Sequence, residues 1–196
     1  MTTNWTDYEL VDFGHGRKLE RFGPWLLDRP CAAADVAPQM PLAWQDATAR
    51  YEGQRAADGK WAPAADSWNP PHWRVSPANL EITFELSALP SGQVGIFPEQ
   101  VVNWHWIAAQ VERGPKPIQV LNLFAYTGGS TLAAARAGAA VTHVDASRSM
   151  VARARTNAAE SGLGTHPIRW IVEDVTKFCQ REVRRGNQYD LSLIHI

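Results

Sequence analysis

The sequence lacks most of the features that mark secreted, membrane-spanning or metal-binding proteins. Its two cysteines, Cys31 and Cys179, lie far apart and form no CxxC or Cys/His spacing, so neither a disulfide framework nor a metal site is expected. No apolar run approaches the roughly 20 residues that cross a bilayer, and residues 1–10 lack the basic and apolar segments of a secretion signal. We therefore expect a cytoplasmic protein without a membrane or metal partner.

An excess of charge of one sign is also missing. The sequence has 19 basic and 20 acidic residues, which leaves a formal charge of -1 and no overall field that would attract nucleic acid. Basic residues do gather between residues 17 and 29, beside aromatic ones, and this permits a small face that binds RNA or protein, although acidic residues lie between them. This basic cluster consists of Arg17, Lys18, Arg21 and Arg29.

Tryptophan, in contrast, is abundant and unevenly spread, with eight of the nine residues before position 110. This first part of the chain has a strand-like pattern, clearest in Leu80–Leu86, where apolar and polar residues alternate. Residues 31–71 predict irregular structure around a hairpin. We predict a small antiparallel β domain over residues 1–97. Its strand-like runs are residues 8–13, 18–27, 73–75 and 80–89.

The second part of the chain has a different pattern. Apolar residues recur at helical spacing over residues 98–113, and after the breaker at residues 114–117 strands and helices alternate, as in βαβ units. Short crossovers favour a parallel sheet with the strand order 3-2-1, in a domain over residues 98–190. The expected strands are residues 119–124, 140–144 and 168–172, and the expected helices are 131–137, 147–161 and 175–185.

The first strand of this α/β domain runs into a glycine turn at the start of a helix. Gly128 and Gly129 have no Cβ, so a ligand can approach the backbone, and the helix start offers free N–H groups to an anion. Asp145 ends the second strand, where a carboxylate can bind both hydroxyls of a ribose. Asp174 ends the third strand, beside the N–H of Val175, where an adenine amine can bind. The three strand ends therefore predict an adenosine site.

Other roles remain open for the same residues. Asp145 and Asp174 are also placed to cap the helices that follow them. Phe124 and Tyr126 could stack on the ligand or fill the core, and we favour contact through their backbones. His105 could be imagined as a general base, but a histidine of a packing helix is the better interpretation. The turn lacks the G-x-G-x-x-G pattern of dinucleotide sites, so a NAD-dependent oxidoreductase is the second hypothesis.

Several segments resemble a known enzyme family, the bacterial class I methyltransferases related to the 23S rRNA cytosine-C5 methyltransferases. They are Asn122–Gly128, the strand end at Asp145, Asn157–Ala158 and Ile168–Asp174. Further upstream, three segments are similar to the small β domain that precedes the catalytic domain in an uncharacterised branch of the family. These are Tyr8–Gly14, Lys18–Pro24 and Gly95–Gln100.

The resemblance implies a Rossmann-like methyltransferase domain, S-adenosylmethionine as the cofactor and RNA as a substrate class. It identifies no catalytic residue in this chain. A non-enzymatic module that binds RNA or protein through the first domain is a third hypothesis. The residues expected to bind the cofactor are Phe124, Ala125, Tyr126, Thr127, Gly128, Gly129, Asp145, Ala146, Ser147, Asp174 and Val175.

The last residues depart from the family pattern. Gln188–Asp190 resembles the start of a fourth strand that ends in Asp-Pro-Pro in such proteins, whereas residues 191–196 resemble a translated sequencing adapter. We therefore expect an incomplete α/β domain that binds cofactor weakly, does not turn over and exposes a sheet edge. The tail alternates like a strand, so it could lie beside the first strand. The alternative is an authentic C-terminus.

Overall fold

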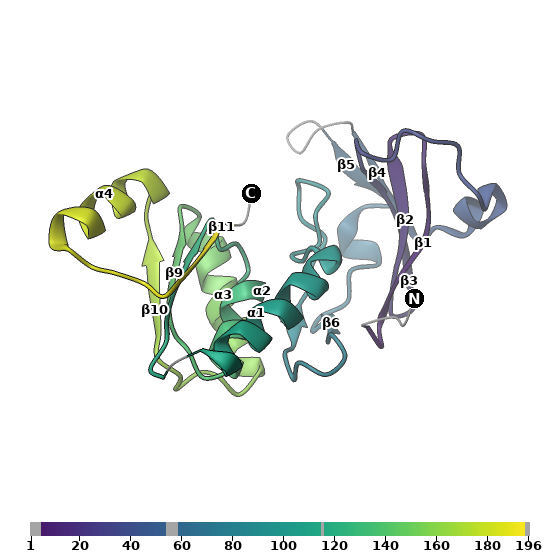
Figure 1. The fold of residues 1–196 in the computed structure, drawn as a ribbon. Helices are drawn as coiled ribbons and strands as arrows, with labels where there is room; N and C mark the ends of the chain where they lie inside the picture. The colour runs from purple at the N-terminus through teal and green to yellow at the C-terminus, as the bar shows by residue number, and fades with distance from the viewer. Residues whose placement is uncertain (1–4, 54–58, 115, 195–196) are drawn as a thin grey trace. The chain divides into compact units, whose positions relative to one another are not determined.

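The computed structural model describes residues 5–53, 59–114 and 116–194 and consists of two compact units (Figure 1). The first unit comprises Met1–Ala78 and Phe84–Ile96, and the second comprises Asn79–Thr83 and Phe97–Ile196. The sequence predicted a single boundary after residue 97. The structure differs because Asn79–Thr83, which precede that boundary, pack within the second unit. No helix in the described ranges is long and apolar enough to cross a bilayer.

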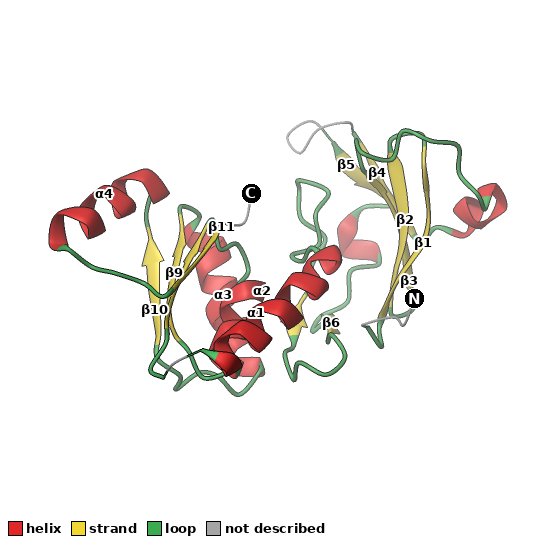
Figure 2. Cartoon of the chain, viewed as in Figure 1, coloured by secondary structure: helices red, strands yellow, loops and turns green. Residues whose placement is uncertain are grey.

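A five-stranded sheet forms the centre of the first unit, with the order β1-β2-β3-β4-β5 (Figure 2). Neighbouring strands are antiparallel except β3 and β4, which are parallel, so the prediction of an antiparallel domain is wrong for that one pair. The strands of this unit are β1 (Tyr8–Gly14), β2 (Arg17–Phe22), β3 (Trp25–Pro30), β4 (Ala49–Glu52), β5 (Lys60–Ala62), β6 (Arg74–Val75) and β7 (Phe84–Glu85). The short 3-10 helices are η1 (Pro41–Asp46) and η2 (Ala65–Ser67).

The segment predicted as the clearest strand, Leu80–Leu86, is a strand only at Phe84–Glu85, which pairs with β6. The apolar side chains of the alternation are buried as expected. Before Phe84, however, the backbone bonds side chains of the second unit. The Thr83 N–H donates to Ser161 Oγ at 2.9 Å, and the Glu81 carbonyl accepts from Arg136 at 2.6 Å. The alternation therefore predicted burial correctly and strand pairing incorrectly.

The second unit contains a four-stranded parallel sheet in the order β10-β9-β8-β11. Helices α1, α2 and α3 lie on one face of this sheet and α4 lies on the other (Figure 1). The strands are β8 (Gln119–Leu123), β9 (Ala140–Asp145), β10 (Ile168–Val172) and β11 (Leu191–Ile194). The helices are η3 (Pro98–Gln100), α1 (Val101–Arg113), α2 (Gly129–Arg136), α3 (Arg148–Glu160) and α4 (Val175–Arg185).

The expected tail enters this sheet as a strand. Residues 191–194 form β11 and pair in parallel with Val120–Leu123 of β8, on the side of β8 opposite to β9. The tail thus lies beside the first strand of the domain, as its alternating pattern predicted. Residues 195–196 lie outside the described residues.

Apolar packing against both faces of the sheet positions the strand ends. On one face, Val175 and Phe178 of α4 pack against Leu121, Leu123 and Val144. On the other face, α2 buries a run of small residues that let the helix approach the strands closely. The carboxyl ends of β8, β9 and β10 are thus held at one edge of a rigid sheet, where ligands of α/β proteins bind.

A buried polar cluster connects β8, α2 and β9 beneath that edge. The Asn122 side chain donates to Thr131 Oγ1 at 2.8 Å, and Thr131 Oγ1 lies 2.9 Å from Nδ1 of His143. All three residues are fully buried. The Thr131 hydroxyl accepts from Asn122, and its oxygen shares a second hydrogen bond with Nδ1 of His143, whose direction depends on the tautomer of the imidazole. Burial, and to a smaller extent Arg155, lowers the pKa of His143 to about 3.

We expect His143 to make the second unit sensitive to acid. Its pKa rises from about 3 in the folded chain to about 6.5 on unfolding, so stability is lost as the pH falls below 6.5. Between pH 7 and pH 5 this loss is about 2 kcal/mol. Urea unfolding followed by circular dichroism at both pH values should show a smaller loss in His143→Asn, whose side-chain amide can still form a hydrogen bond with Thr131. An equal loss in both proteins would contradict this expectation.

Candidate functional site

The turn after β8 has an unusual backbone. Phe124, Tyr126 and Gly128 adopt φ angles of 52°, 51° and 95°, and the residues between them do not have positive φ. Left-handed backbone costs a residue with a side chain roughly 1–2 kcal/mol, and such strain clusters at ligand sites. Alternation of this kind also turns successive N–H groups toward one side, as in anion-binding nests. The turn is therefore suited to bind a ligand through its backbone.

Asp145 holds this turn in place. One of its carboxylate oxygens accepts from the N–H of Tyr126 and the other from the N–H of Ser147, both at 2.8 Å. The carboxylate thus joins the turn after β8 to the turn after β9. Each oxygen keeps a second lone pair, which leaves it able to accept from a ligand hydroxyl. The cap of α3 is Ser147, which accepts from the Met150 N–H at 3.4 Å, so the alternative role of Asp145 as the cap is wrong.

The start of α2 supplies further donors. Its N-cap is Gly128, which cannot provide a side-chain acceptor, and no side-chain bond caps the helix. The N–H groups of the first turn, at Gly129 and Ser130, are therefore available to a ligand together with the positive end of the helix dipole. Thr127, in the preceding turn, is buried, and its carbonyl accepts from the Asn157 amide at 3.0 Å.

In the structure, glycine is needed at positions 128 and 129 for a different reason from the expected one. A Cβ at Gly129 would lie 2.4 Å from Cζ2 of Trp104, and a Cβ at Gly128 would lie 3.2 Å from the Cβ of Ala154. In both cases the missing side chain leaves room for protein atoms. The expectation that the glycines make room for the ligand is therefore wrong for the positions that their Cβ atoms would take. The turn is suited to a ligand because of its backbone angles and its free N–H groups.

Asp174 and Val175 mark the end of β10 at the same edge. Asp174 is exposed and caps α4 by accepting from the Lys177 N–H at 2.9 Å, as its alternative role predicted. Val175 is buried. Ala146 lies between the acceptor Asp145 and the cap residue Ser147, and it is exposed. One oxygen of Asp174 remains outside this cap, so capping does not prevent it from accepting from a ligand.

Phe124 does not fill the core, because 47% of its surface is exposed. It instead lines an open groove of about 700 Å³ at the carboxyl end of β8, with mostly apolar walls. Most of the wall comes from α4, of which only Val175 was predicted to belong to the site. A signal was present in the sequence, since the apolar residues of α4 recur at helical spacing beyond those needed for the core. The lining residues are Phe124, Val175, Thr176, Cys179, Gln180, Val183 and Arg184.

His105 lies away from this edge. It is half-buried on α1 and lines a separate pocket with Glu81, Glu112 and Arg136, as well as apolar residues. The interpretation of His105 as a residue of a packing helix is thus consistent with its place. Among the described residues no group of three or more histidine, cysteine or acidic side chains could hold a metal ion. Cys31 and Cys179 are both half-buried free thiols.

The basic cluster of the first unit does not form a free positive face. Arg29 is buried and binds Glu20 through two hydrogen bonds, while Lys18 lies 3.1 Å from the same carboxylate. Burial alone would raise the pKa of Glu20, but Arg29 and Lys18 outweigh it and hold that pKa below its ordinary value. Arg17 pairs with Asp28 at 2.5 Å. These charges are balanced inside the unit, which argues against the hypothesis of a binding face there.

We expect Gly129→Ala to destabilise the second unit. The new Cβ would overlap the Trp104 ring, and overpacking of this kind costs about 1–3 kcal/mol. Gly164→Ala is the matched control, because its Cβ would meet only ordinary contacts and its φ is not positive. Urea unfolding should separate the two variants, and Trp104→Phe should partly restore Gly129→Ala. Equal stability of both alanine variants would contradict the packing account.

Comparison with known proteins agrees with this geometry. Residues 120–195 match the family model described as a methyltransferase domain. The structure of the SAM-dependent methyltransferase from Agrobacterium tumefaciens is 43% identical and superposes with a TM-score of 0.86, over 96% of this chain and 59% of that chain. A protein proposed to be a methyltransferase, solved with SAH, shares the fold at 20% identity, with a TM-score of 0.69 over 96% of this chain and 51% of that chain.

A curated relative matches a shorter stretch. Ribosomal RNA large subunit methyltransferase I from Aeromonas hydrophila is 35% identical over 77 residues, which are 39% of this chain and 19% of the relative. The chain therefore spans 51–59% of the length of the two solved structures and a smaller share of the curated relative. With the fold of the second unit, these matches show that residues 120–195 form a methyltransferase domain.

Proposed function

We propose that the edge formed by the ends of β8, β9 and β10 binds S-adenosylmethionine, and that the protein transfers its methyl group to an acceptor. The observation that carries this proposal is the Asp145 carboxylate, held by the N–H groups of Tyr126 and Ser147 in a methyltransferase domain. It stands at a strand end with a free lone pair on each oxygen. A pair of adjacent ribose hydroxyls is the complementary ligand group.

The remaining residues of the site fit the other parts of the cofactor. The first-turn N–H groups of α2, at Gly129 and Ser130, suit the carboxylate of its amino-acid arm. The apolar groove beside Phe124 and Val175 suits the adenine ring, and Asp174 is placed to accept from its amine. Phe124, Ala125, Tyr126 and Thr127 contribute the backbone of the turn, and Ala146 and Ser147 that of the neighbouring turn.

When bound, the cofactor supplies a methyl group on a positively charged sulfur, which needs an acceptor aligned with the breaking bond. This chain therefore contributes positioning. The turn after β8, which Asp145 holds in place, would keep the cofactor in one orientation before the acceptor arrives. The buried Asn122, Thr131 and His143 cluster lies below that turn and links β8, α2 and β9.

RNA is the acceptor class that we propose. The support is the match to a ribosomal RNA methyltransferase at 35% identity over 77 residues. The balanced ion pairs of the basic cluster give no support for phosphate recognition at that surface.

The cofactor proposal is tested by calorimetry with S-adenosylhomocysteine and with NAD. We expect the chain to bind S-adenosylhomocysteine and not NAD, and Asp145→Ala to weaken that binding at least tenfold. Asp190→Ala is the matched control, because Asp190 also accepts a backbone N–H, that of Gln119 at 2.8 Å, at the opposite end of β8. Binding of NAD, or equal affinity in both variants, would overturn the proposal. Thermal unfolding of each variant separates lost contacts from lost folding.

Asp174 requires a different test, because it also caps α4. If it accepts from the adenine amine, the wild type should bind S-adenosylhomocysteine several-fold more tightly than the inosine analogue, which lacks that amine. Asp174→Ala should then bind the two compounds equally, whereas Asp174→Ser keeps a capping oxygen and isolates the cap. A preference for adenine that persists in Asp174→Ala would show that Asp174 is only a helix cap.

A further inference from the structure

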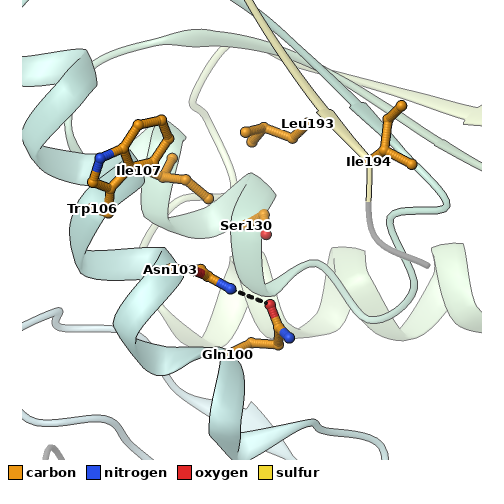
Figure 3. A pocket seen from close by; sticks show the side chains of 7 residues that line it. All are labelled: Gln100, Asn103, Trp106, Ile107, Ser130, Leu193 and Ile194. Atoms are coloured by element: carbon orange, nitrogen blue, oxygen red, sulfur yellow. Dashed lines mark hydrogen bonds between the residues drawn. The ribbon is translucent and has the colours of Figure 1, made fainter.

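A further pocket lies beside α1 in the second unit (Figure 3). It has a volume of about 160 Å³, well below the size of sites for drug-sized ligands, so it suits a single small ring system. Its wall comes from α1 and the residue before it, from the first turn of α2 and from the end of β11, which belongs to the segment that resembles a translated sequencing adapter. The lining residues are Gln100, Asn103, Trp106, Ile107, Ser130, Leu193 and Ile194.

The chemistry of the wall selects a neutral and planar group. None of the seven lining residues ionises, so a phosphate, carboxylate or amine would find no opposite charge there. Trp106 is 53% exposed. An exposed indole offers a flat face on which an aromatic ring can stack.

A pair of amides lies at one end of the pocket, with Trp106 and Leu193 toward the other (Figure 3). Nδ2 of Asn103 donates to Oε1 of Gln100 at 2.8 Å. Within the described residues no further hydrogen bond occupies the Asn103 carbonyl oxygen or the Gln100 amide nitrogen. The pair therefore presents an acceptor beside a donor. Exchanging oxygen and nitrogen in both side chains would reverse this order but keep one of each.

The pocket adjoins the proposed cofactor site. Ser130 lines it and stands in the first turn of α2, directly after Gly129. The same helical turn would thus face the cofactor through its N–H groups and this pocket through the Ser130 side chain. A ring seated in the pocket would lie next to the site from which a methyl group is donated.

We propose that this pocket receives an unpaired nucleobase of the RNA acceptor, stacked on Trp106 and hydrogen-bonded along its edge by Gln100 and Asn103. The proposal rests on the proposed function and adds to it the residues that select the acceptor. The Watson-Crick edge of a base carries donors and acceptors side by side, which matches the amide pair, and its ring is neutral and planar. A base within a duplex would not present that edge, so the target must be single-stranded.

The test measures binding of a fluorescently labelled single-stranded RNA of ten nucleotides by anisotropy, in saturating S-adenosylhomocysteine. Trp106→Ala should weaken RNA binding about tenfold, and Trp106→Phe should weaken it less, because phenylalanine keeps a stacking face. Val102→Ala is the matched control: Val102 is an exposed residue of the same helix outside the pocket and should leave binding unchanged. Asn103→Leu should weaken binding and reduce the preference among bases at one position.

Calorimetry with S-adenosylhomocysteine on the same variants separates this proposal from the proposed function. Unchanged cofactor affinity together with weakened RNA binding supports the base pocket. Trp106→Ala that binds RNA like the wild type overturns it, and so does Trp106→Ala that loses only cofactor affinity, which would assign the pocket to the amino-acid arm of the cofactor. A wild type that binds S-adenosylhomocysteine but no RNA also overturns the base pocket while the cofactor proposal stands.

Discussion

The Asp145 carboxylate connects the turn after β8 with the turn after β9, and the site depends on this connection. The bond from the Tyr126 N–H, at 2.8 Å, helps to hold the strained segment in which Phe124 and Tyr126 keep left-handed backbone, and the bond from the Ser147 N–H ties that segment to the next turn. Backbone hydrogen bonds of Ala125 and Gly128 hold the same turn. The same carboxylate is the proposed ribose acceptor, so one side chain both organises the site and contacts the ligand.

Packing beneath the turn makes this arrangement rigid. Trp104 fills the space that a side chain at Gly129 would need, and the buried Asn122, Thr131 and His143 cluster connects two strands with α2. Hydrogen bonds inside such a buried cluster are strong because little water competes for them. The edge of the sheet is therefore fixed before a ligand binds, which limits the entropy lost on binding.

Two surfaces meet at the first turn of α2. On one side, the groove beside Phe124 and the strand-end carboxylates suit an adenosine; on the other, the pocket of Trp106 suits a neutral ring. Both lie in the second unit, whereas Arg17, Lys18 and Arg29 of the basic cluster are paired with carboxylates of the first unit. In our proposal, stacking and amide contacts select the acceptor.

Local patterns in the sequence determined the alternation of strands and helices, the glycine turn, and the acidic residues at the ends of β9 and β10, because these depend on neighbours along the chain. Only the tertiary structure decided why Gly129 must be glycine, that Asp145 bonds Tyr126, and that Glu81 and Thr83 bond side chains of Arg136 and Ser161 instead of pairing in a strand. Each of these depends on groups about twenty to eighty positions apart, whose contacts no local pattern records.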